Sequence, residues 1–170
     1  MGDLSGNVQK IIAAAAEAYA NGARLLLTPE LALCGYAAED LYLRPAFLEA
    51  CDAALQQLQQ ASVQWPGLAL VIGHPQRDAQ GEKLFNAASV LRDGQQIARY
   101  FKQLLPNFGV FDEQRYFAAG EESCVFELDG IQIGLLICED AWHAGPARIA
   151  VAAGAQLLVV INASPFHSGK

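Results

Sequence analysis

Residues 124–142 read CVFELDGIQIGLLICEDAW, two mostly apolar runs that are joined by Asp129-Gly130 and end on a cysteine and two acids. Asp-Gly between two such runs is typical of a tight β-hairpin. The second run stops at Ile137, so we expect Cys138 at the end of a strand. Ligands bind at the carboxyl ends of strands in open α/β sheets, so this stretch predicts both a sheet and a place for a functional site.

Three other stretches have the pattern of helices. Apolar residues at helical spacing predict an amphipathic helix over residues 7–23, whose apolar face carries Val8, Ile11, Ile12, Ala15, Ala16 and Tyr19. Pro45 is expected to begin a second helix that runs to about Ser62, and a short third helix is expected near residues 146–153.

Short apolar runs between these helices predict strands. Buried strands are expected at residues 24–28, 68–73 and 156–162. Asp93-Gly94 predicts a second hairpin between residues 84–91 and 95–101, and residues 103–120, which lack any periodicity, are expected to form a long functional loop. The order of helices and strands indicates a mixed α/β fold in layers.

The composition excludes several classes of protein. The 170 residues carry 11 Lys and Arg against 18 Asp and Glu, a net charge of −7, which argues against a nucleic-acid partner or an anionic membrane surface. Charged residues make up 17% and apolar residues 53%, so we expect sheets that are covered on both faces, or surface that is buried against a partner. No run approaches the roughly 18 apolar residues of a membrane span, and MGDLSGN lacks the features of a secretory signal.

The cysteines and histidines do not suggest a metal site. The four cysteines and three histidines lack metal-ligand spacing, and no CxxC motif is present. We therefore expect a metal-free protein with reduced thiols, located in the cytoplasm.

Three polar residues stand where apolar runs end. Glu30 follows LLLTP, Lys102 follows ARYF and Cys138 follows IQIGLLI. We expect the three to converge at one edge of a sheet. Burying a charged acid or a charged base costs roughly several kcal/mol unless the two are paired. Pairing them around a thiol removes that cost and should lower the pKa of the thiol.

Each residue alone also has a simpler interpretation. Cys138 could be an inert core thiol, Glu30 a cap and Lys102 a solvated strand end. Together they suit amide hydrolysis through a thioester: the carboxylate takes the thiol proton as general base, and the thiolate attacks the acyl carbon. The ammonium and a backbone N–H beside the cysteine can stabilise the oxyanion.

Three segments resemble the active-site blocks of the nitrilase superfamily, whose catalytic set is Glu, Lys and Cys: LTPELALCGY (27–36), FKQLLPNFGVFDEQRYF (101–117) and GLLICEDAW (134–142). Within the superfamily, residues 36–41, 107–113, 138–142 and 162–170 are similar to the glutaminase domain of glutamine-dependent NAD synthetases. The resemblance implies a nitrilase-like four-layer αββα sandwich, of which residues 1–170 are a part truncated at both ends. The first strand, the last third of the domain and the synthetase domain are expected outside this sequence.

The resemblance also implies roles for individual residues. Glu30 would be the general base, Lys102 the cation at the oxyanion, Cys138 the nucleophile and Glu113 a second glutamate beside the lysine and the substrate. The glutamine pocket would be shaped by Tyr36, Phe108, Glu139, Ser164 and Lys170. Glu139 and Lys170 are the expected charge partners of the α-ammonium and the α-carboxylate of glutamine.

The implied activity is hydrolysis of glutamine through a γ-glutamyl thioester, which supplies ammonia to ATP-dependent synthesis of NAD from its deamido form. No cofactor is expected within residues 1–170, because no SGGxDS-type loop is present. ATP and magnesium would bind the separate synthetase domain, and the parent protein is expected to be a homo-oligomer.

Other interpretations of the sequence remain open. A stand-alone amidase or carbamoylase of the same superfamily would share Glu30, Lys102 and Cys138. A papain-like pair of Cys138 with His143 would lack a positioned third group. A non-catalytic interaction module would explain the apolar excess without any chemistry.

Overall fold

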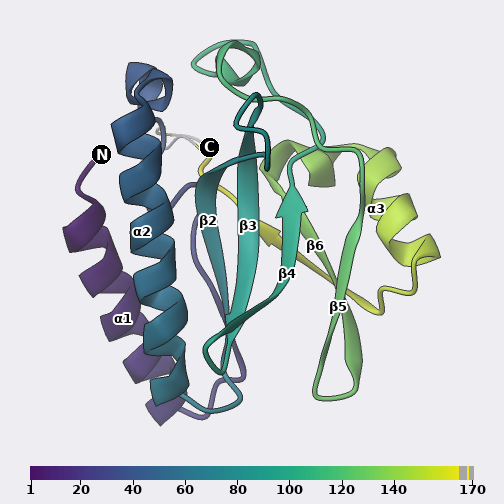
Figure 1. The fold of residues 1–170 in the computed structure, drawn as a ribbon. Helices are drawn as coiled ribbons and strands as arrows, with labels where there is room; N and C mark the ends of the chain where they lie inside the picture. Colours follow the sequence, from purple (N-terminus) through teal and green to yellow (C-terminus); the bar gives the residue numbers. More distant parts are fainter. Residues whose placement is uncertain (165–167, 169–170) are drawn as a thin grey trace.

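Two β-sheets pack face to face, and helices cover their outer faces (Figure 1). The computed structural model describes residues 1–164 and 168. The first sheet has the strand order β1-β2-β3-β4, formed by β1 (Leu25–Leu27), β2 (Ala69–Arg77), β3 (Leu84–Arg92) and β4 (Gln95–Phe101). The second has the order β5-β6-β7, formed by β5 (Cys124–Leu128), β6 (Ile131–Ile137) and β7 (Leu157–Ile161).

The helices are α1 (Leu4–Ala20), α2 (Pro45–Ala61) and α3 (Ala144–Ala152). Short 3-10 helices span Glu39–Leu43, Ser62–Gln64, Glu113–Arg115 and Cys138–Trp142. Asp3 caps α1, because its carboxylate accepts a hydrogen bond from the Gly6 N–H (2.9 Å), and Pro45 begins α2. No strand or long helix lies within residues 103–120, which confirms the predicted long loop; its one short helical turn is Glu113–Arg115.

Alternating side chains of β2 build two cores. Ala69 and Val71 face the second sheet, whereas Leu70 and Ile72 pack against α1 and α2. These four residues are fully buried, which confirms the expected strand covered on both faces. Such a strand needs no charged residue, and this accounts for the low charge of the chain.

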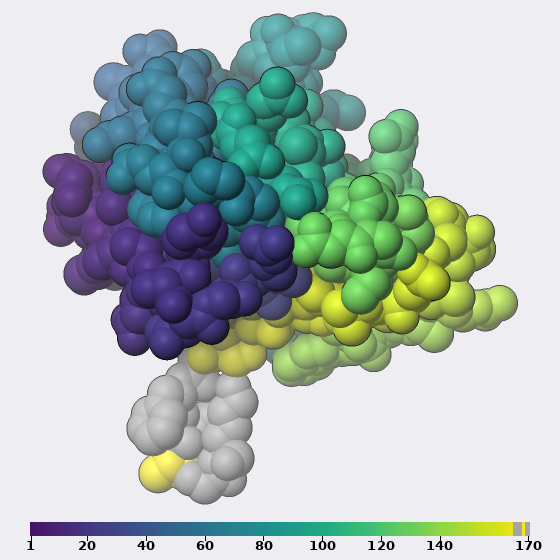
Figure 2. Space-filling view, turned by 90° about the horizontal axis from the view of Figure 1, so that it is seen from below, coloured from purple at the N-terminus to yellow at the C-terminus, as the bar shows by residue number. Residues whose placement is uncertain are grey.

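The second sheet is covered on its outer face by α3, where Ala150 is buried and Ala147 packs on the core. Seen from below, the purple and blue helices lie on one side of the molecule and the yellow-green part on the other (Figure 2). The layers are thus helix, sheet, sheet and helix, which confirms the predicted four-layer αββα fold.

Both Asp-Gly hairpins form as predicted, and Asp93 and Asp129 adopt left-handed φ angles of 52° and 51°. Two burial predictions were wrong. Ala16 and Tyr19 are exposed on α1, because α2 and the sheet cover only the narrower stripe through Val8, Ile11 and Ala15. Leu27 is also exposed, because β1 is the outermost strand of its sheet among the described residues.

Candidate active site

The polar residues at the strand ends meet between the two sheets. Glu30 follows β1 and Lys102 follows β4, both in the first sheet, whereas Cys138 follows β6 in the second. Our expectation of one edge of one sheet was therefore wrong. The residues converge because the sheets pack face to face, so that strand ends from both layers meet across the interface.

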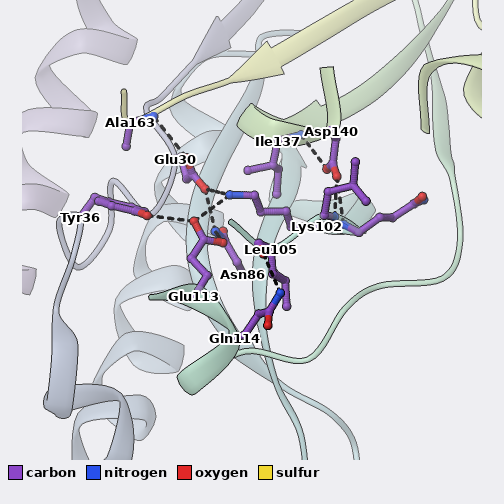
Figure 3. Close-up of polar contacts among 12 residues, drawn as sticks. Glu30, Tyr36, Asn86, Lys102, Leu105, Glu113, Gln114, Ile137, Asp140 and Ala163 are labelled. Carbon is purple, nitrogen blue, oxygen red and sulfur yellow. Dashed lines mark hydrogen bonds and ion pairs between the residues drawn. The ribbon is translucent and has the colours of Figure 1, made fainter. Parts of the chain in front are cut away.

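Lys102 lies at the centre of a buried ionic cluster (Figure 3). Its Nζ atom donates to Oε1 of Glu30 (2.6 Å) and to Oε1 of Glu113 (2.8 Å), and all three side chains are buried. The Tyr36 hydroxyl donates to Glu113 Oε1 (2.9 Å), and Asn86 Nδ2 donates to Glu30 Oε1 (2.8 Å). One ammonium thus forms ion pairs with two carboxylates, and the neutral donors of Tyr36 and Asn86 add hydrogen bonds to the same carboxylates.

The charged groups in this cluster shift each other's pKa values. Burial lowers the pKa of Lys102, but the two neighbouring carboxylates outweigh burial, so its pKa is raised and the side chain stays an ammonium. Burial also raises the pKa of Glu113, as does the charge of Glu30, and the opposing effects of Lys102 and Tyr36 do not cancel this. Glu113 is therefore a carboxyl group that takes up a proton more readily than an ordinary glutamate.

Cys138 begins the 3-10 helix after β6 with a left-handed φ of 47°, a conformation that a non-glycine residue rarely adopts. Its thiol is buried, near the Glu30 carboxylate, the Lys102 ammonium and the Ala163 N–H, which all shift its pKa. Burial and the charge of Glu30 raise the pKa of Cys138 to about 11, whereas Lys102 lowers it only in part. The expected lowering of this pKa was wrong, because desolvation and the adjacent carboxylate outweigh an ammonium that two carboxylates already share. Cys138 is thus a neutral thiol at pH 7, with a carboxylate nearby.

Close backbone contacts hold Glu30 and Lys102 in place. A Cβ atom at Gly73 would lie 2.5 Å from Leu31 N and from Pro29 O, so only glycine lets residues 29–31 cross β2. At Gly120 it would lie 2.3 Å from the Phe101 carbonyl oxygen, and the Gly120 N–H donates to Lys102 O (2.8 Å). The two glycines therefore fix the segments that carry Glu30 and Lys102.

Asp140 connects the cysteine turn to the loop after Lys102, and our sequence analysis missed it. Its Oδ1 accepts from the N–H groups of Leu104 (2.8 Å) and Gln103 (3.2 Å). Its Oδ2 accepts from the Tyr100 hydroxyl (2.9 Å) and the Ile137 N–H (3.3 Å). The carboxylate is fully buried, so these bonds fix the turn that carries the thiol relative to the end of β4.

Asn86 was missed as well, although the sequence contains a signal for both residues. Asn86 is a polar residue inside the apolar run LFNAASVL of β3, and Asp140 directly follows the Cys-Glu pair at a strand end. A polar residue in a run buried on both faces must find a polar partner. That requirement identifies Asn86 as a residue near the site, but it does not name the partner.

The residues predicted to bind substrate are dispersed. Tyr36 lies in the cluster, through its bond to Glu113. Glu139 and Phe108 both line a cavity of about 660 Å³ on the side of the 103–108 loop. Ser164 is exposed after β7, and Lys170 lies outside the described residues.

His143 does not contact the thiol. Its Nε2 atom lies 3.1 Å from Glu139 Oε1, and its side chain is mostly exposed. The arrangement gives no support to a papain-like pair with Cys138. In the described part of the chain, no group of His, Cys, Asp and Glu has the geometry of a metal site, and no helix is long and apolar enough to cross a membrane.

The geometry agrees with the comparison with known families. The family model for carbon-nitrogen hydrolases matches residues 1–170, the whole sequence. The chain belongs to the carbon-nitrogen hydrolase family. This membership agrees with the layered α/β fold described above.

Named relatives of this carbon-nitrogen hydrolase are similar over its whole length. Glutamine-dependent NAD(+) synthetases from Xanthomonas campestris and Xylella fastidiosa are 45% and 43% identical to it, and each match covers 100% of this chain. The chain spans only 30% and 31% of the length of these curated relatives.

Solved structures agree in fold. The glutamine-dependent NAD+ synthetase from Acinetobacter baumannii matches with a TM-score of 0.90 and 36% identity, over 99% of this chain and 31% of that one. A mutant of an amidase from Nesterenkonia sp. AN1, with acrylamide added at its active-site cysteine, matches with a TM-score of 0.82 and 28% identity, over 98% of this chain and 64% of that one.

Proposed function

We propose that this carbon-nitrogen hydrolase chain hydrolyses the side-chain amide of glutamine through a thioester on Cys138. The observation that carries the proposal is the buried ion pair of Glu30 with Lys102 (2.6 Å), near enough to Cys138 that both charges shift the pKa of its thiol. The synthetases that resemble this chain over its whole length are named as glutamine-dependent, and this supports glutamine as the substrate.

The first half of the reaction forms the thioester. Glu30 takes the proton of the Cys138 thiol as the sulfur attacks the amide carbon. A base is required, because a thiol with a pKa of about 11 is almost entirely protonated at pH 7. Glu30 then gives the proton to the leaving nitrogen, which departs as ammonia. In the second half, water attacks the thioester, Glu30 takes the proton of the water, and glutamate leaves as the sulfur regains its proton.

Lys102 is placed to stabilise the oxyanion that forms in both halves. An ammonium has three N–H donors, and two of them are bound to Glu30 and Glu113. The third has no partner among the described residues and can meet the oxyanion, together with a backbone N–H beside Cys138. Because the two carboxylates hold the ammonium in place, little reorganisation is needed during the reaction.

The activity of the whole protein is a wider proposal. We place residues 1–170 in a partial glutaminase domain, whose ammonia passes to a synthetase domain that binds ATP and magnesium and makes NAD. The four free cysteines suit a reducing compartment such as the cytoplasm, and a homo-oligomer suits the apolar excess of the chain.

The test is Cys138→Ala in the intact natural protein that carries this chain. We expect NAD synthesis with glutamine to be abolished and synthesis with added ammonia to be retained. Loss of both activities, or retention of both, contradicts the proposal.

Covalent labelling of the cysteines tests the nucleophile directly and distinguishes the proposal from a non-catalytic module. All four cysteines are buried, and burial raises the pKa of each thiol, so thiol acidity alone does not favour Cys138. We expect a diazoketone analogue of glutamine to modify Cys138 and to spare Cys34, Cys51 and Cys124. Equal labelling of all four thiols, or none, contradicts an activated nucleophile.

A second candidate is a stand-alone amidase. It is favoured by the match to the Nesterenkonia amidase, of which the chain covers 64%. Turnover of short aliphatic amides that exceeds turnover of glutamine would favour this candidate, and the same Glu30, Lys102 and Cys138 would then act on a smaller substrate.

A further inference from the structure

The ionic cluster contains a fourth buried side chain, that of Asn86 on β3. Asn86 is fully buried, and its Nδ2 atom donates to Glu30 Oε1 (2.8 Å) and, at longer range, to Glu113 Oε2 (3.4 Å). Figure 3 shows the amide beside the two carboxylates, at the point where Lys102 reaches them. The amide thus contacts the expected base and the second glutamate at the same time.

We propose that Asn86 is a positioning residue that reserves one oxygen atom of Glu30, Oε2, for the proton of Cys138. The inference rests on the proposed function, because it describes how the base of that reaction is held.

Hydrogen bonding makes the two oxygens of Glu30 unequal. Oε1 accepts from Asn86 Nδ2 and from Lys102 Nζ (2.6 Å), and two donors fill the in-plane lone pairs of a carboxylate oxygen. Oε2 accepts only the Ala163 N–H (3.2 Å) among the hydrogen bonds of the described residues. Oε2 therefore keeps a lone pair, and Oε1 does not.

The Ala163 N–H lies on the side of the free oxygen, since it donates to Glu30 Oε2 (3.2 Å). The pKa of the Cys138 thiol is raised by Glu30 and lowered by the Ala163 N–H, so the thiol lies near both groups. Without the Asn86 donor, Oε1 would also have a free lone pair, and the carboxylate could rotate away from the productive orientation. The amide thus selects the oxygen that takes the proton.

An amide suits this position better than a charged group. The cluster already holds one ammonium and two carboxylates, so a third carboxylate would add repulsion, and a second cation would bind the base too firmly. Asparagine offers two N–H donors and no charge. Its Oδ1 atom is buried and accepts no hydrogen bond from the described residues, an arrangement that packing alone does not explain.

The test uses Asn86→Leu, which keeps the branched shape of the side chain and removes both donors. A hydrogen bond to the charged form of a carboxylate favours that form, so its loss should move the acidic limb of the pH profile of kcat upward, by about one pH unit. We expect kcat to fall by about tenfold or more while KM for glutamine changes little, because the orientation of the base is lost. The other titratable groups that face Glu30 or Glu113 (Lys102, Cys138 and Tyr36) are unchanged in this variant.

Two further variants keep the inference falsifiable. Asn86→Ser has a hydroxyl one bond shorter than the amide, too short for the bond to Glu30, and it removes volume instead of adding it. We expect a shift in the same direction even if the leucine variant does not fold. Ser89→Ala, on the same strand, is the matched control: it removes a buried hydrogen bond to His74 (2.8 Å) outside the cluster and should leave the pH profile unchanged. Wild-type profiles in both Asn86 variants, with only a loss of stability, would overturn the inference.

Alkylation of Cys138 by iodoacetamide separates this inference from the proposed function. The rate as a function of pH reports the thiol and its base without any glutamine. If the wild-type protein does not hydrolyse glutamine, yet Asn86→Leu shifts the alkylation profile upward, then the proposed function fails and the positioning role stands. If glutamine is hydrolysed and neither profile shifts, the positioning role fails alone.

Discussion

Lys102→Met is predicted to destabilise the fold strongly and in a pH-dependent manner. The Lys102 side chain is fully buried, and its Nζ lies 2.6 Å from Glu30 and 2.8 Å from Glu113. Methionine has a similar length and no charge, so the change leaves two buried carboxylates without their ammonium. Removing one partner of a buried ion pair costs about 3–5 kcal/mol.

The cost should grow as the pH rises. Without Lys102, one carboxyl group takes up a proton in the folded state, and Glu113, whose pKa burial already raises, is expected to be that group. The folded state then binds more protons than the unfolded state, so its stability falls with rising pH. The loss should therefore be full near about pH 8 and smaller near about pH 5, with a slope of at most about 1.4 kcal/mol per pH unit for one proton.

The assay is a urea titration of the intact protein in which hydrogen exchange of β3 and β4 peptides reports the unfolding of this part. Lys102→Met combined with Glu113→Gln should recover part of the lost stability, because the double variant removes one of the two unpaired charges. Lys10→Met, at an exposed position of α1, is the matched control and should change stability by less than about 0.5 kcal/mol. A loss below about 1 kcal/mol for Lys102→Met near pH 8, or a loss that neither pH nor Glu113→Gln relieves, would refute the reasoning.

Three further predictions concern the residues that support the site and its proposed base, Glu30. Gly73→Ala should destabilise the fold by about 1–3 kcal/mol or more, because its Cβ would meet backbone atoms at 2.5 Å. Gly145→Ala in α3 has open space around it and should be neutral or stabilise by up to about 1 kcal/mol. Thermal unfolding of the two variants checks the contrast. Asp140→Ala should cost about 3 kcal/mol or more, since it leaves buried donors without an acceptor, and peptide-level hydrogen exchange should rise at residues 103–104; unchanged exchange there speaks against the connection. Glu30→Gln should slow alkylation of Cys138 near pH 7, because the thiol loses its base, and the rate should recover as the pH rises and the thiol ionises by itself. This recovery should come below about pH 11, because the variant lacks the Glu30 charge that helps to raise the pKa of Cys138 to that value; equal rates in both proteins at neutral pH would show that Glu30 is not the base.

Much of the fold could be predicted because it depends on short-range chemistry. Asp93-Gly94 and Asp129-Gly130 specify their hairpins through the turn itself, and Pro45 begins α2 where its ring fits the first turn of a helix. The burial of the first half of β2 on both faces follows from the uncharged apolar run at residues 68–73, whereas the continuation of the strand to Arg77 was not predicted. Exposure of Tyr19 and Leu27 was missed, because it depends on which neighbours cover a helix face or a strand edge.

The acid, the base and the thiol of the site were predicted from position alone. Each of Glu30, Lys102 and Cys138 follows an apolar run, and a polar residue at a buried strand end needs a partner. Their positions predicted that they converge, and the family resemblance added a catalytic role for each. The partners Asn86 and Asp140 were missed, because a polar residue within or beside a strand does not reveal what lies opposite it.

The sequence by itself thus determined the strands, the turns and the residue types that stand at the strand ends. Only the tertiary structure decided that two sheets contribute to the site, that Asn86 and Asp140 support it, and that the pKa of Cys138 is raised rather than lowered. The physical reason is separation along the chain. Glu30 lies 72 residues from Lys102 and 133 residues from Ala163, and electrostatic and desolvation effects depend on distance in space, which only the packing of the two sheets fixes.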